Sequence, residues 1–265
     1  MNFGKSSNFL AVFAILVALA AQARAAIIVT NNFDSDPLWT GVNNTSGGAN
    51  YGFSPGTSNA GGSAGEVGGL FTRQAAENYY AHVFMSGVGT DVLNYDSEIE
   101  GSGRFIVSSL SAFDNNVLIG HRSSSLSDFS FLGLFIAEST PSLVRTYAGI
   151  VADDGTLFLG GPMFASVGTA YDFGYDYDPQ GGVNSLGRLT LTVTGLGTVF
   201  TDVSASQRSA DPIFLNAFGI GTPSVSSVPS NQANVFFDNA IYTIPEPTSV
   251  VLLCLAGLAL ARRRR

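Results

Sequence analysis

Cysteine is almost absent from this 265-residue chain, since Cys254 is the only one. It lies in an apolar stretch near the C-terminus, so the rest of the chain has no disulfide, no thiolate nucleophile and no cysteine-based metal site. Histidine and tryptophan are nearly as rare: His82, His121 and Trp39 are all there are. Two histidines far apart in the sequence do not predict a histidine-centred site, and one tryptophan gives little aromatic surface for a glycan cleft.

Basic residues are also few, and half of the twelve lie near the ends of the chain: Lys5, Arg24 and the four arginines from Arg262 to Arg265. Of the twenty acidic residues only Glu246 lies there. The chain between the ends therefore has nineteen acids against six arginines, a formal charge near −13. Nucleic acid and anionic lipid both bind to basic surface, so this balance argues against either as a partner.

The first 25 residues have the three parts of an export signal. Lys5 gives a positive start, Phe9 to Ala21 is an apolar core, and Ala23-Arg24-Ala25 is a small-residue cleavage site. This order predicts a signal peptide over residues 1–25, removed by signal peptidase between Ala25 and Ala26. The alternative is a retained N-terminal anchor.

The extreme C-terminus also has three parts in order. Pro245, Glu246 and Pro247 predict an extended, stiff tether, because each proline fixes its own φ and keeps the preceding residue out of the helical region. Residues 250–261 are apolar throughout, but a helix of that length spans roughly 18 Å of a hydrocarbon core of about 30 Å. Four arginines follow, a cytoplasmic anchor by the positive-inside rule: Arg262, Arg263, Arg264 and Arg265. Such a marginal transmembrane helix suits a segment that is later removed.

This tail, Ile244 to Arg265, resembles the PEP-CTERM sorting signal of Gram-negative and related bacteria. The resemblance implies recognition by an exosortase, an integral-membrane enzyme similar to cysteine transpeptidases, and cleavage near the motif. It implies a protein held briefly in the inner membrane and then delivered to the cell envelope or outside. An ordinary tail anchor is the alternative, and neither interpretation says what the exported part does.

Between the signals, residues 26–244 consist of short alternating runs separated by Gly, Asn, Asp, Ser and Pro. No stretch has a convincing helical stripe, so one all-β domain is expected. Residues 43–65, rich in Asn, Gly and Ser, predict a long surface loop or short edge strands. The later predicted strands are Glu66–Thr72, Tyr79–Phe84, Ser97–Ser108, Asn116–Arg122, Phe129–Glu138, Val144–Ala152, Thr156–Leu159, Ala170–Asp178, Arg188–Thr194, Thr198–Ser204, Ile213–Gly219 and Asn234–Ile244.

Two segments show the alternation most plainly. Aromatic residues alternate with Asp or Gly over Tyr171–Asp178, and aliphatic residues with threonine over Leu189–Thr194. Period two predicts half-buried antiparallel strands, and Asp154-Gly155 predicts a tight hairpin. The fold class is thus a single antiparallel β-sandwich or barrel.

The layout resembles the concanavalin A-like lectin and glucanase jelly rolls. The resemblance covers most of residues 26–244 and is carried by Phe33-Asp34 with Trp39, by Tyr175-Asp176-Tyr177-Asp178 before Gly187–Val193, and by the closing run Val235–Ile241. It implies two large sheets, a last strand that pairs near the first, and carbohydrate as a ligand class by analogy.

The sharpest candidate for catalysis is the acidic row Asp96, Glu98 and Glu100. On one strand these side chains would share a face, with neighbours about 6.6 Å apart along the backbone. Tilting could bring two carboxylates to the separation of a glycosidase pair, about 5–5.5 Å. Jelly-roll glucanases have the order Glu-x-Asp-x-(x)-Glu, from which this row departs, so a solvated strand face is the favoured interpretation.

Other acids lie at predicted turns, in Asp153-Asp154 and in Asp172, Asp176 and Asp178. A turn such as Asp176–Gly182 could give several oxygens to a structural calcium, although no EF-hand pattern is present. We find no nucleophile elbow, phosphate loop or zinc motif. The sequence therefore predicts an exported, non-catalytic structural or adhesive protein of the envelope or an exopolysaccharide matrix, with extracellular polysaccharide as a candidate partner. A glycan-cleaving hydrolase and a calcium-assisted lectin remain as alternatives.

Overall fold

The computed structural model describes residues 26–72, 74–84, 92–111, 116–210, 212–223 and 232–245. Ile28–Thr243 forms one compact unit, apart from the two ends of the chain. In the described ranges, no helix is both long and apolar enough to cross a membrane.

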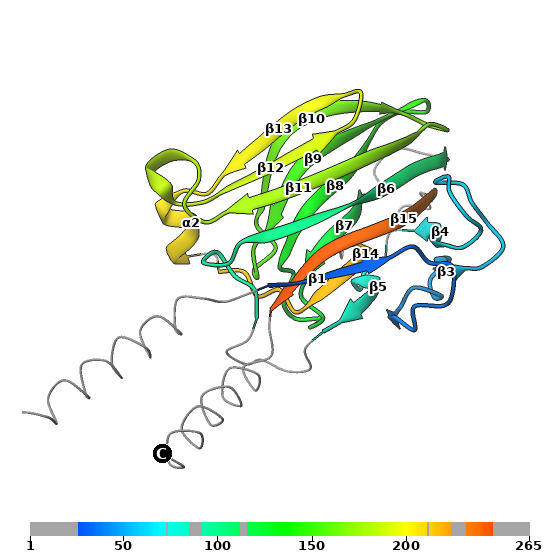
Figure 1. Cartoon of the computed structure of the whole chain (residues 1–265), viewed down its shortest axis with the longest axis horizontal. Coiled ribbons are helices and arrows are strands. Elements are labelled where there is room, and N and C mark those ends of the chain that lie inside the picture. The colour runs from blue at the N-terminus through cyan, green and yellow to red at the C-terminus, as the bar shows by residue number, and fades with distance from the viewer. Residues whose placement is uncertain are drawn as a thin grey trace, which may run out of the picture. The chain divides into compact units, whose positions relative to one another are not determined.

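Two antiparallel sheets make up this unit (Figure 1). In spatial order, sheet A contains β13 (Gly197–Asp202), β12 (Arg188–Val193), β11 (Ala170–Asp178), β6 (Ile99–Leu110), β15 (Gln232–Pro245), β4 (Glu66–Thr72) and β3 (Asn50–Ser54), and β1 (Ala26–Asn31) also pairs with β15. Sheet B contains β10 (Leu157–Ser166), β9 (Leu143–Val151), β8 (Phe131–Thr140), β7 (Asn116–Arg122), β14 (Ala217–Thr222), β5 (Asn78–Val83) and β2 (Thr40–Val42). The predicted all-β antiparallel sandwich is confirmed, as is the pairing of the last strand with the first.

Alternation decides which side chains enter the core. In β11, Phe173, Tyr175 and Tyr177 are buried while Asp176 and Asp178 are exposed. The inner faces of the two sheets meet in an aromatic core that includes Trp39, whose ring lies 5.2 Å from Phe33, 6.2 Å from Phe218 and 6.5 Å from Tyr242 between ring centroids. Trp39 is 7% exposed, so the single tryptophan belongs to the core and does not line a surface cleft.

Most predicted strands are confirmed, and the bounds of β4, β7 and β11 are those predicted. Residues 43–65 were expected to form either a long surface loop or short edge strands, and they contain the edge strand β3. Asp154-Gly155 forms the β9–β10 hairpin, where Gly155 takes a left-handed φ of 87°. The prediction of no helix was wrong for a short one, α2 (Ala205–Ala210), which has no buried residue and therefore no apolar stripe to reveal it.

Two strand predictions were wrong in their extent. The strand expected at Ile213–Gly219 is β14, which begins at Ala217, because Ile213 and Leu215 are buried outside the ladder and only Leu215 forms an isolated bridge, to Leu93. The strand expected to end at Leu159 continues as β10 to Ser166, across a register shift between Gly160 and Met163.

Candidate functional site

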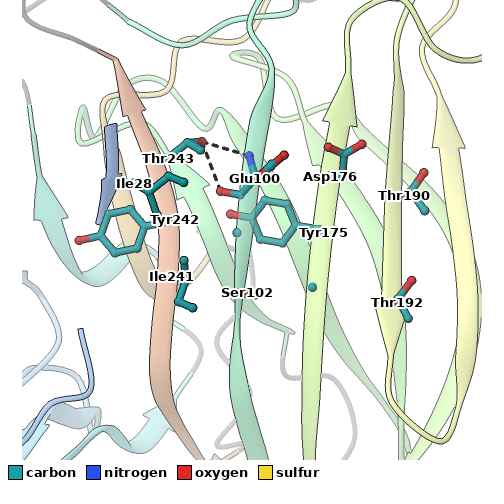
Figure 2. A pocket seen from close by; sticks show the side chains of 12 residues that line it. Ile28, Glu100, Ser102, Tyr175, Asp176, Thr190, Thr192, Ile241, Tyr242 and Thr243 are labelled. Carbon is teal, nitrogen blue, oxygen red and sulfur yellow. Dashed lines mark hydrogen bonds between the residues drawn. The ribbon is translucent and has the colours of Figure 1, made fainter. Parts of the chain in front are cut away.

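A groove of about 360 Å³ lies on the outer face of sheet A, over β6, β11, β12 and β15 (Figure 2). It is lined by Ile28, Glu100, Gly101, Ser102, Gly174, Tyr175, Asp176, Thr190, Thr192, Ile241, Tyr242 and Thr243. Its polar groups are the hydroxyls of Ser102, Thr190 and Thr192 and two carboxylates, while apolar surface, including two exposed isoleucines, makes up the larger part of the lining. None of the described residues that line it is a lysine or an arginine.

Strand register brings the two carboxylates together. Glu100 of β6 pairs directly with Asp176 of β11, and Asp176 pairs on its other side with Thr190 of β12. Figure 2 shows these three side chains on neighbouring strands. Directly opposed residues in an antiparallel ladder have Cβ atoms about 4.5–5.5 Å apart, so two carboxylates here repel each other unless one holds a proton.

Burial and this repulsion both act on Asp176. The pKa of its carboxyl is raised, first by partial burial and then by the nearby charges of Glu100, Asp178 and Glu98. Asp176 therefore holds a proton at a higher pH than a free aspartate does. It is the described group in the groove that is best suited to give or share a proton.

The floor of the groove is made of small residues. Ser102 and Gly174 oppose each other across β6 and β11. A Cβ atom added at Gly174 would have Ser102 Cβ, at 3.8 Å, as its nearest neighbour outside the adjoining residues. The missing side chain at Gly174 therefore leaves open space on the outer face, and no close backbone contact requires it.

One wall is formed by β15, whose ladder with β6 shifts register between Asp238 and Ile241. Such a bulge re-aims the side chains that follow it. Beyond it Ile241 is 43% exposed toward the groove. Thr243 fixes the end of this wall, because its Oγ1 accepts a hydrogen bond from Glu100 N at 3.0 Å and lies 3.3 Å from Glu100 O (Figure 2).

His121 supports the groove from the core. Its Nε2 lies 2.6 Å from the carbonyl oxygen of Thr243, which can only accept, so Nε2 carries the proton. Nδ1 then accepts from the Tyr175 hydroxyl at 2.7 Å. A Cβ at Gly101 would lie 2.3 Å from the Tyr175 oxygen, so only glycine leaves room for this phenol to reach His121. Complete burial lowers the pKa of His121 to about 4, so the ring is neutral at pH 7.

The second histidine, His82, lies in the same region as His121. The distance between the two residues in the sequence gave no sign of this. His82 Nδ1 is 2.7 Å from the Tyr242 hydroxyl, and the rings of both histidines lie near that of Tyr242. Burial lowers the pKa of His82 as well. Neither histidine lines the groove, and both ring nitrogens of His121 are engaged by protein groups.

The structure does not place Asp96, Glu98 and Glu100 in one row on a strand. Asp96 lies in a turn before β6 and forms an ion pair with Arg208 of α2. Glu98 lies between that turn and β6, and only Glu100 belongs to the strand and lines the groove. The expectation that the three acids share one strand face was therefore wrong, since the carboxylate facing Glu100 comes from β11.

Three of the five acids proposed for calcium have protein partners in the structure. Asp172 pairs with Arg104 at 3.6 Å, Asp178 accepts from Gln180 N, and Asp154 accepts from Thr156. In the described ranges, no three acidic, histidine or cysteine side chains converge as a metal-binding group would.

The residues of the two predicted signals fall almost entirely outside the described residues. Ala26 and Pro245 are the outermost residues of β1 and β15. Outside lie the signal peptide up to Ala25, Glu246, Pro247, the apolar helix, and Arg262, Arg263, Arg264 and Arg265.

Comparisons with known proteins identify a sorting motif at the C-terminus. Residues 243–265 match the PEP-CTERM protein-sorting motif. No curated protein is similar enough in sequence to match the chain. Among solved structures, a protein of unknown function from Shewanella oneidensis MR-1 is 15% identical at a TM-score of 0.49, covering 88% of this chain and 93% of that chain.

Two further solved structures are similar to this chain at comparable levels. Peanut lectin is 11% identical at a TM-score of 0.43, covering 83% of this chain and 97% of its own. An alginate lyase from Klebsiella pneumoniae is 14% identical at a TM-score of 0.44, and the match covers 70% of this chain and 83% of the lyase. Such identities concern the fold alone. The chain thus carries at its C-terminus a PEP-CTERM sorting motif, which indicates export and sorting to the cell surface with processing by an exosortase, joined to a two-sheet antiparallel β-sandwich.

Proposed function

We propose that the exported domain is a non-catalytic, structural or adhesive component of the cell envelope or extracellular matrix, and that it binds polysaccharide along the groove of sheet A. The observation that carries the proposal is the lining of this groove. Ser102, Thr190 and Thr192 present hydroxyls, and Glu100 and Asp176 present acceptor oxygens. Saccharides offer many hydroxyl donors and apolar C–H faces, and the latter match the exposed isoleucines at the groove wall.

The charge of the groove lining indicates which class of polysaccharide the groove would bind. The groove has two carboxylates and no basic lining residue among those described, within a domain that carries an excess of acid. A uronate or sulfated chain would bring further negative charge against Glu100 and Asp176. The proposed ligand is therefore a neutral polysaccharide.

A binding role is favoured over catalysis because both carboxylates are exposed to water. A general acid is normally held at high pKa by burial in a site that excludes water. The histidines, which are common general bases, lie behind the groove and are bonded to protein groups.

The full-length gene is expressed in a host with an exosortase, and the protein is purified in the form that this host produces after processing. Binding to neutral β-glucans and agars, and to alginate, would be measured by affinity electrophoresis with calcium and with EDTA. Gly174→Leu fills the groove without a backbone clash, and Ser142→Leu adds the same side chain at an exposed turn elsewhere. Retardation by a neutral polysaccharide that Gly174→Leu abolishes and Ser142→Leu retains supports the proposal. Equal retardation of both variants contradicts it, and binding that EDTA removes would favour a calcium-assisted lectin.

A second candidate is a glycan-cleaving hydrolase, favoured by the raised pKa of Asp176 beside Glu100. In that case Asp176 would be the acid and Glu100 its partner, in place of the row expected from sequence. The same polysaccharides would be assayed for new reducing ends with the parent, Glu100→Gln and Asp176→Asn. Cleavage by the parent that both substitutions abolish would establish the hydrolase and reject the non-catalytic role.

A further inference from the structure

A second cavity, of about 380 Å³, lies at one end of the sandwich and shares no lining residue with the groove. It is formed by the loop 123–130 between β7 and β8, by the β9–β10 hairpin, and by the segment that leads into β14. Its polar lining includes four serines of that loop, two carboxylates, from Asp128 and Asp153, and the amide of Asn216. The ring of Phe214 and the side chain of Val92 add apolar surface to it.

The loop is held in place before any ligand arrives. Ser124 N donates to Asn216 Oδ1 at 2.8 Å, and Asn216 Nδ2 donates back to Ser124 Oγ at 2.9 Å. The backbone N of Phe214 donates to Ser130 Oγ at 3.0 Å. Binding to such a pre-organised pocket loses little conformational entropy.

Both carboxylates offer acceptor oxygens. Asp128, which lines the cavity, uses Oδ1 to accept from the backbone N and the hydroxyl of Ser130, at 2.9 and 2.6 Å, and no described residue donates to its Oδ2. The side chain of Asp153 makes no hydrogen bond or ion pair with any residue that the structure describes. Its backbone alone is engaged, by Pro212 and Phe129. A carboxylate that accepts two hydroxyls of one ligand binds more strongly than neutral acceptors do.

Phe214 is 40% exposed although its chain neighbour Leu215 is fully buried. An exposed ring beside carboxylates and hydroxyls gives an apolar surface for the C–H face of a pyranose, while the acids take its hydroxyls. No basic residue is among the lining residues described, and the nearby Arg122 is buried in an ion pair with Glu77. An anionic sugar would therefore meet only negative charge.

We propose that this cavity binds a single neutral hexose unit of a glycan, with Asp128 and Asp153 as hydroxyl acceptors and Phe214 as the stacking surface. The site is independent of the groove on sheet A, so one domain has two places at which it can hold glycan. An adhesive protein with two such sites can join two polysaccharide chains.

The experiment uses the protein expressed from the full-length gene and purified in the form that its host produces after processing. Methyl glycosides of glucose, galactose and mannose, and sodium glucuronate as the anionic probe, are titrated by ligand-observed NMR. Asp153→Ala removes a carboxylate with no described partner, and Asp154→Ala removes the adjacent carboxylate, which lies outside the cavity. We expect one neutral glycoside to bind, Asp153→Ala to weaken it by about tenfold or more, and Asp154→Ala to leave it unchanged.

Several results would overturn the proposal: no binding of any neutral glycoside by the parent, equal affinity of the two aspartate variants, or equal binding of glucuronate. Binding that EDTA abolishes and calcium restores would also overturn it, because the acids would then hold a cation. Gly174→Leu separates the two sites. If it abolishes glycoside binding, the sugar lies in the groove, so this proposal fails while the proposed function stands. If it leaves binding intact, the separate cavity is supported.

Discussion

Replacement of His121 by glutamine should change how the stability of the domain depends on pH. Complete burial lowers the pKa of His121 from 6.5 to about 4, because the protonated ring would lose its hydration and could no longer accept from Tyr175. The unfolded chain binds this proton near pH 6.5 and the folded chain does not. Stability is therefore complete above about pH 6.5 and is lost as the pH falls toward 4.

The size of this effect follows from the shift. Each pKa unit corresponds to about 1.4 kcal/mol, so the folded state loses roughly 3 kcal/mol between pH 6.5 and pH 4 through His121 alone. Glu77, Asp176 and Asp238 have raised pKa values and act in the opposite sense within that window, so the parent curve alone does not isolate the histidine. The difference in stability between the parent and a variant without this histidine does isolate its contribution.

His121→Gln keeps a side-chain N–H that can donate to Thr243 O but cannot be protonated. At pH 7.5 the variant should be less stable than the parent by about 1–3 kcal/mol, because the buried hydrogen bonds no longer fit as well. By pH 4.5 the gap should close or reverse. Urea unfolding is followed by the fluorescence of Trp39, the only tryptophan and a core residue beside Tyr242.

His82→Gln is the matched control, since His82 is only partly buried and its pKa is lowered for the same reason. Its gap from the parent should change with pH in the same direction and by less. A gap between the parent and His121→Gln that stays constant from pH 7.5 to 4.5 would refute the reasoning.

Four further outcomes are expected. Glu66→Ala should destabilise the domain by about 3 kcal/mol in urea unfolding, because this fully buried carboxylate accepts three hydrogen bonds from the turn before it. Arg122→Met alone should cost about 3–5 kcal/mol by leaving Glu77 buried and unpaired, and adding Glu77→Leu should recover most of that loss. Alanines at 245–247 should leave an unprocessed, membrane-held form on immunoblots, and equal processing of mutant and parent would contradict a sorting role. N-terminal sequencing of the mature protein should begin at Ala26, and recovery of Met1 would contradict signal cleavage.

Local patterns were sufficient for most of the fold. The alternation over Tyr171–Asp178 correctly predicted β11 and the face that each of its residues takes. It failed where buried side chains lie outside a ladder, as in the segment before β14, and at β10, which was expected to end at Leu159 but continues to Ser166. In those places packing and a bulge override the local signal.

The site was less accessible to sequence reasoning, because it depends on register between distant strands. Glu100 was noted as a candidate and does line the groove, but its expected partners were its neighbours in the chain. The facing carboxylate, Asp176, had been considered only for calcium. Nothing local in either segment specifies that β6 and β11 pair with Glu100 opposite Asp176. A signal was present in the aromatic face of β11, which showed that its aspartates share the outer face, but not which strand lies beside them.

The strands that form the groove place residues that face the groove and residues that support the core at alternate positions. Along β11, Asp176 faces the groove while its neighbour Tyr175 reaches His121 in the core, and along β6 Glu100 faces the groove while Gly101 makes room for that tyrosine. Period two thus assigns the lining of the groove and the support of the core to alternate residues of the same segments. Changes at Glu100, Gly174 or Asp176 can alter the surface with little cost to the fold, whereas changes at Gly101 or Tyr175 disrupt the core. The side chains of the outer face can therefore vary while the sandwich beneath them stays the same.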